Sequence, residues 1–133
     1  MKTFWKNNGG GAADWGNSNY RFAVKDKGTN ECLATFSQTA WNKIKTSTFY
    51  LVVEGENPQI RVTNGWWDAN WQPNDITPGN SLLTKNVNED GVWDGTWTLT
   101  VNLTGSNLVN TIDQKHLLFT GQGFTPVKLF YIE

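Results

Sequence analysis

The segment RVTNGWWDANWQPND, residues 61–75, holds the side chains best suited to chemistry in this sequence. Trp66, Trp67 and Trp71 fall within six positions there, among Asn, Asp, Gln, Gly and Pro, which are typical of loops. A flat, rigid indole stacks on the apolar face of a sugar ring at little entropic cost, and amide or charged side chains bind the hydroxyl groups around the ring. The segment is therefore either folded into the core or part of a surface that binds such a ligand.

Polar side chains on the preceding residues extend this pattern. In PQIRVTNG, residues 58–65, Ile60 and Val62 alternate with Gln59, Arg61 and Thr63, which predicts a strand with one apolar and one polar face. We expect Gln59 and Arg61 to face the ligand. Asn64 has the opposite parity and joins them only if the strand bulges.

The remaining candidates come from the tryptophans and one strand end. Because successive residues of an extended chain point to opposite sides, one of Trp66 and Trp67 is expected to face the ligand and the other to fill the core, and the sequence leaves open which. The exposure of Trp71, in the loop proper, stays open too. Glu54 ends an apolar run and could hydrogen-bond a ligand on the sheet face, and Trp15 could form the edge of a binding surface.

Residues for catalysis are scarce. A glycoside hydrolase needs a pair of carboxylates, but most acidic residues here lie beside Gly or Asn, where a solvated turn residue is expected. His116 is the only histidine and Cys32 the only cysteine, so they cannot build a zinc site or an intrachain disulfide. No nucleophile-elbow or phosphate-binding motif occurs. We therefore expect no catalytic residues and no required cofactor.

Length and charge narrow the class of partner. The chain has 133 residues, which fits a single domain spanning 1–133. Its formal net charge is −1, which argues against nucleic acid or an acidic membrane as a partner. No stretch is apolar enough to span a bilayer, so membrane insertion is not expected, and the first residues, MKTFWKNNGGG, lack an apolar signal region.

The elements that must position these side chains are short strands. Apolar alternation between turn residues predicts six or seven strands, near residues 3–6, 19–25, 48–55, 58–65, 95–105, 116–121 and 127–133. Residues 37–45, with Ser37 as N-cap, and residues 106–116 predict short helical turns. Trp97 and Trp41 are expected in the core, whereas Trp93 is placed in a turn. The pattern predicts an all-β fold, an antiparallel β-sandwich.

Three segments together carry a resemblance to a known family. IRVTNGWWDANW, GTWTLTVNLTG and QKHLLFTGQGFTPVKLFYIE resemble a bacterial carbohydrate-binding module of the β-sandwich type, similar to families 4, 9 and 22, as inserted in or appended to family 10 xylanases. The resemblance covers about the last eighty residues well and the N-terminal third loosely. It implies a jelly-roll fold, no catalytic activity and the option of a structural calcium ion.

The resemblance also implies a function and a setting. We expect non-catalytic binding of a β-1,4-linked plant polysaccharide or oligosaccharide, with xylan favoured over other β-glycans. Such a module acts beside the catalytic domain of a secreted parent enzyme, which is extracellular, periplasmic or at the cell surface. Two alternatives stay open, namely a small glycoside hydrolase or lyase, and a protein-interaction sandwich whose tryptophans bury against a partner.

Overall fold

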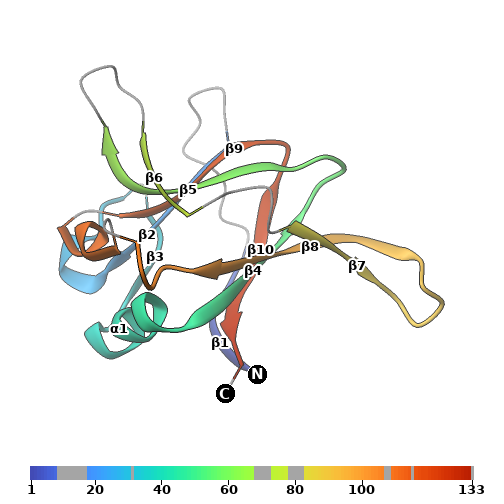
Figure 1. The fold of residues 1–133 in the computed structure, drawn as a ribbon, viewed down its shortest axis with the longest axis horizontal. Coiled ribbons are helices and arrows are strands. Elements are labelled where there is room, and N and C mark those ends of the chain that lie inside the picture. Colours follow the sequence, from blue (N-terminus) through green and yellow to red (C-terminus); the bar gives the residue numbers. More distant parts are fainter. Residues whose placement is uncertain are drawn as a thin grey trace.

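The protein is a sandwich of two five-stranded sheets. The computed structural model describes residues 1–8, 18–30, 32–67, 73–77, 83–106, 109–114 and 116–132. Over these residues the chain forms ten strands and only short helices (Figure 1). The predicted all-β sandwich is confirmed.

The first sheet, sheet A, is antiparallel throughout. Its order is β1 (Lys2–Lys6), β10 (Thr125–Tyr131), β4 (Thr48–Glu54), β8 (Trp93–Asn102) and β7 (Leu83–Val87). Since β1 pairs with β10, the first and last strands lie side by side, and both ends of the chain are at the bottom of Figure 1.

The second sheet, sheet B, carries the Trp-rich strand. Its order is β3 (Cys32–Phe36), β2 (Ser18–Val24), β9 (Leu117–Gln122), β5 (Gln59–Trp67) and β6 (Pro73–Thr77). All neighbours are antiparallel except β2 and β3, which run parallel. The chain crosses repeatedly between the two sheets, as in a jelly roll.

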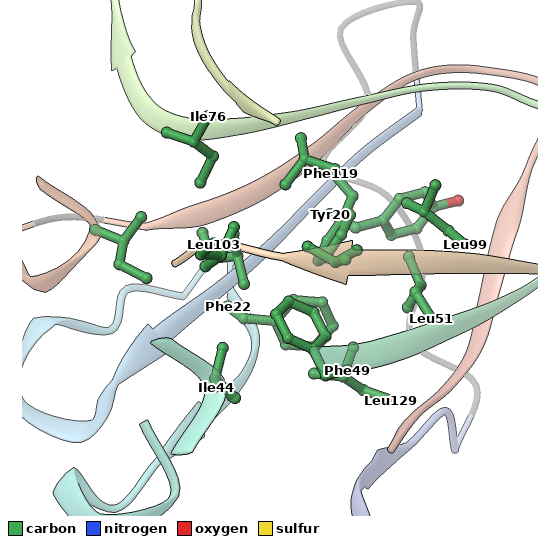
Figure 2. Close-up of a cluster of buried hydrophobic side chains, with 14 of the residues drawn as sticks. Tyr20, Phe22, Ile44, Phe49, Leu51, Ile76, Leu99, Leu103, Phe119 and Leu129 are labelled. Carbon is green, nitrogen blue, oxygen red and sulfur yellow. The ribbon is translucent and has the colours of Figure 1, made fainter. Parts of the chain in front are cut away.

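The core lies between the sheets and follows the predicted alternation. Phe22 on β2 and Phe119 on β9 belong to sheet B, and Phe49 on β4 and Leu99 on β8 belong to sheet A; all four are fully buried. Figure 2 shows side chains from both sheets meeting in this layer. Burial of such apolar side chains, at about 25 cal/mol per Å² removed from water, is the main stabilising term of a fold like this.

One helix closes an end of the sandwich. α1 (Gln38–Thr46) begins after Ser37, whose side chain accepts a hydrogen bond from the backbone N–H of Ala40, as the sequence predicted. Trp41, fully buried, donates from its indole nitrogen to Asp113, 2.8 Å away. Asp113 lies on η3 (Val109–Gln114), a 3-10 helix within the second predicted helical segment. Another 3-10 helix, η1 (Lys25–Lys27), follows β2.

The predicted number of strands was wrong, because three strands were missed. These are β3, β6 and β7, and each lies at the edge of its sheet. An edge strand pairs on one side only and tolerates polar residues and proline, as the sequence PNDIT of β6 shows. The placement of Trp93 in a turn was also wrong, because it starts β8 opposite Val87 of β7.

None of the helices within the described residues has the length and apolar character needed to cross a membrane.

Candidate functional site

The polar face of β5 has the predicted orientation. Ile60 and Val62 are buried between the sheets, whereas Gln59 and Arg61 point outward and are exposed. The alternation read from the sequence is therefore confirmed over this part of the strand. Because β5 is hydrogen-bonded to β9 on one side and β6 on the other, its outward residues meet side chains of both neighbours.

An ion pair between Arg61 and Asp75 joins β5 to β6. Arg61 donates from Nε to one carboxylate oxygen of Asp75 at 2.9 Å and from Nη2 to the other at 3.0 Å. The two side chains are 44% and 55% exposed, so the pair contributes at most about 1 kcal/mol to stability. Its effect is geometric, since the carboxylate holds the guanidinium fork in one orientation toward solvent.

A polar row extends from this pair across sheet B. Gln59 lies opposite Gln122 of β9, and both side chains are exposed. Arg61 lies opposite Thr120, which donates a hydrogen bond to Asn19 of β2. Thr120 and Asn19 are buried, so among these paired residues the exposed side chains lie on β5, β6 and the end of β9. We call Gln59, Arg61, Asp75 and Gln122 the polar strip.

Asn64 does not belong to the polar strip. It is 1% exposed, and its amide donates to the hydroxyl of Thr111 on η3 at 2.7 Å. The pairing of β5 with β6 shifts register between Val62 and Thr63, and Thr63 is fully buried as well. Asn64 therefore joins the strand to η3, a structural task that competes with direct contact to a ligand.

The other predicted site residues fall in several places. Trp66 and Trp67 continue β5 after the polar strip, with the Trp67 backbone opposite Pro73 of β6; their side chains are not described. Trp71 and Trp15 lie outside the described residues. Glu54 is exposed at the end of β4, in the other sheet, opposite Thr96 and Thr125.

Asp75 is a site residue that the sequence pattern did not single out. The sequence PNDIT is typical of a loop and predicts Asp75 as a solvated turn residue. The only strand signal there is Ile76, which is 4% exposed and faces the core. A prediction of β6 as a strand beside β5 would have placed Asp75 close to Arg61.

A second aromatic group lies on the hairpin of β7 and β8, which projects to the right in Figure 1. Trp93 and Trp97 pack edge to face with ring centroids 5.9 Å apart, and the Lys85 ammonium lies 5.5 and 5.4 Å from them. We call these three residues the arm cluster. Both indole N–H groups donate to backbone carbonyls at 2.8 Å, that of Trp93 to Thr96 and that of Trp97 to Gly55. Trp97 packs on the core, as predicted, but remains half-buried.

Metal ligands do not gather among the described residues, which contain no group of three or more His, Cys, Asp or Glu side chains placed to share an ion. The option of structural calcium therefore stays a prediction.

Comparison of the chain with protein-family models, with curated proteins and with solved structures finds no significant match. The function is therefore inferred from the geometry of the site.

Proposed function

We propose that this protein is a non-catalytic module that binds a β-1,4-linked glycan, with xylan favoured, at the polar strip and the Trp-rich segment that follows it. The observation that supports this most is the Arg61–Asp75 pair, which is half exposed and bidentate. It lies on the same hairpin as the backbone of Trp66 and Trp67.

The chemistry of the polar strip suits sugar hydroxyls. A hydroxyl group both donates and accepts, and the strip offers both functions in its two glutamine amides and its Arg–Asp pair. Hydrogen bonds to charged groups are worth about 1.5–3 kcal/mol, roughly twice a neutral one. The polar strip would therefore orient the sugar through hydrogen bonds to its hydroxyl groups, and indoles of the neighbouring segment would stack on the sugar ring.

Binding by one such module is expected to be modest, because exposed hydrogen bonds compete with water. Its use would be to raise the local concentration of an attached enzyme on insoluble polysaccharide. On this proposal the setting is a secreted parent enzyme, and the module itself carries no catalytic residue.

Affinity electrophoresis tests the proposal directly. Migration should be retarded in gels containing xylan, and Arg61→Ala should weaken the interaction about tenfold or more, as loss of a charged hydrogen-bonding group predicts. Lys128→Ala is the matched control, because it removes one positive charge from β10 in the opposite sheet. Unchanged migration of the wild type in xylan, β-glucan, mannan and starch gels would rule the proposal out.

A protein-binding role is the second candidate, and one observation favours it. Val87 and Val92, at the tip of the β7–β8 hairpin, are each 58% exposed beside Trp93. Exposed aliphatic groups next to an indole are typical of a protein interface. If this role is correct, Trp93→Ala abolishes capture of a protein partner and leaves glycan binding intact. Arg61→Ala does not abolish capture of the partner but does weaken glycan binding.

A further inference from the structure

A depression on the opposite side of the fold from β6 is lined by residues that no part of the proposed function uses. It lies between β1, the end of β10 and α1, and has a volume of about 620 Å³. Ligand pockets commonly measure about 300–1,000 Å³, so the size suits a small molecule.

The lining is positively charged in a protein whose net charge is −1. Lys2 and Lys43 contribute two ammonium groups, and none of the described lining residues is acidic. Within the described part of the chain, neither lysine forms a salt bridge. A carboxylate entering the depression would therefore meet two cations and, among the described lining residues, no opposing charge.

Most of the other lining residues carry a neutral polar group. Side-chain hydroxyls come from five residues, namely Thr3, Ser37, Thr39, Thr46 and Tyr131, and an amide comes from Asn42. Several are held in place, since the Thr46 hydroxyl donates to the Asn42 carbonyl at 2.8 Å and the Ser37 hydroxyl accepts from the N–H of Ala40. Such a lining matches a ligand that carries several hydroxyl groups.

An aromatic wall completes the site. The rings of Phe4 and Tyr131 stack with centroids 4.7 Å apart, and the Lys43 ammonium lies 5.2 Å from the Tyr131 centroid. Phe4 also packs edge to face on Phe36, which is buried in the core, so the wall is rigid. A rigid ring favours the apolar face of a pyranose, whereas a bare inorganic anion gains nothing from it.

We propose that this depression binds a uronic acid, with its carboxylate between Lys2 and Lys43, its hydroxyl groups on the threonine and serine side chains, and its ring against Phe4 and Tyr131. This site is separate from the polar strip and goes beyond the proposed function. It would give the module a second, charge-selective contact with a sugar.

The test is an NMR titration of the intact chain with glucuronate, glucose and inorganic phosphate. Glucuronate should shift the amide signals of β1, Tyr131 and the first turn of α1 with saturation. Glucose, which has the same ring without the charge, and phosphate, which has charge without the ring, should bind at least about tenfold more weakly, as loss of a charged contact predicts. Equal affinity for glucose or for phosphate would overturn the proposal.

Variants locate the effect. Lys43→Gln and Lys2→Gln should each weaken glucuronate binding about tenfold. Lys85→Gln is the matched control, because that lysine also lies over aromatic rings but at a different end of the molecule. Arg61→Ala should leave the titration unchanged. A loss in the Lys85 or Arg61 variant equal to that in Lys43→Gln would refute the site, whatever the outcome of the xylan gels.

Discussion

Lys43 and Lys85 both lie over aromatic rings, in different parts of the molecule, and their surroundings differ. Lys43 covers Tyr131 beside α1, with Lys2 and several hydroxyl groups nearby. Lys85 covers Trp93 and Trp97 on the projecting hairpin, whose turn and flanking residues include three acids, Glu89, Asp90 and Asp94. The same pairwise contact therefore occurs in a basic environment and in an acidic one.

The difference also extends to how the rings are held. In the arm cluster both indole N–H groups are bonded to backbone carbonyls, so the polar end of each ring is used within the fold. Beside α1 the aromatic wall consists of Phe4 and Tyr131, and the lining of the depression includes five hydroxyl-bearing residues, of which Thr46 and Ser37 also form hydrogen bonds within the fold. We infer that the arm cluster mainly fixes the hairpin, whereas the α1 side offers its polar groups to a ligand.

The largest effect is expected from Gly55→Ala, which disturbs the contact that attaches the arm cluster to the rest of the fold. Gly55 has φ +148°, and a Cβ there would lie 2.1 Å from the carbonyl oxygen of Gly123. Its own carbonyl accepts the Trp97 indole, so a shift of this residue also breaks that bond. Strain and overpacking together should lower the free energy of unfolding by roughly 3–5 kcal/mol, measured by urea denaturation.

Gly91→Ala is the control for that substitution. Gly91 also has positive φ, +76°, but a Cβ there meets no atom within 4 Å. Only the backbone strain of about 1–2 kcal/mol should remain. If both variants lose the same stability, the contact between Gly55 and Gly123 does not matter and the arm is not fixed in this way.

Trp97→Ala should have the next largest effect. The side chain packs on the core from a half-buried position and donates to Gly55, so its loss should cost about 2–3 kcal/mol, below the range for a fully buried tryptophan. Trp97→Phe should recover most of that, because it restores the ring but not the N–H donor. Urea unfolding gives both values. An unchanged urea midpoint in Trp97→Ala would mean that the arm cluster does not stabilise the hairpin, which contradicts the structural role inferred for it.

Replacing each lysine by glutamine compares the two environments directly. Lys85 contacts two rings and Lys43 one, so Lys85→Gln should cost about 1 kcal/mol and Lys43→Gln about half of that. The order should reverse for glucuronate binding, where only Lys43→Gln is expected to matter. The same order in stability and in binding would show that the two clusters have one role.

The sequence predicted most of the fold because the central strands carry a clear signal. In β8 the alternation of Trp97, Leu99 and Val101 with threonines identifies both the strand and its buried face. Edge strands lack this alternation, because an edge strand pairs with a neighbour on one side only and contacts the core with few residues. In β6 the described side chains are those of Asp75 and Ile76, and of these two Ile76 alone is buried, a pattern too short for periodicity to detect.

The candidate site was predictable only as far as parity holds. Gln59 and Arg61 were placed on the correct face because the strand alternates regularly up to Val62. Beyond it Thr63 is buried although it has the parity of Arg61, and Asn64, with the parity of Val62, donates to Thr111 of η3; such burial depends on tertiary packing that alternation does not encode. The pairing of Arg61 with Asp75 spans 14 positions and needed the hairpin geometry.

The smallest effect is the dependence on pH of the stability of the β7–β8 hairpin. Asp94 accepts hydrogen bonds from the Thr96 hydroxyl at 2.7 Å and its backbone N–H at 2.8 Å, and these bonds lower the pKa of this exposed carboxyl below its ordinary 3.8. Because the pKa in the folded state is depressed, the stabilisation is fully present above the unfolded value. It is lost as the pH falls through the folded value. Asp94→Asn keeps an acceptor for Thr96 but cannot titrate.

We therefore expect the Thr96 amide signal to move in the wild type at a pH below 3.8 and to stay constant in Asp94→Asn. Between pH 5 and 8 the two proteins should respond alike. The depression beside α1 has no described acid in its lining, so its Tyr131 and Thr39 signals should not follow this titration in either protein. If those signals move together with Thr96 in the wild type but stay constant in Asp94→Asn, the two ends are coupled through the sandwich, and the separation between a structural arm and a ligand-binding depression fails.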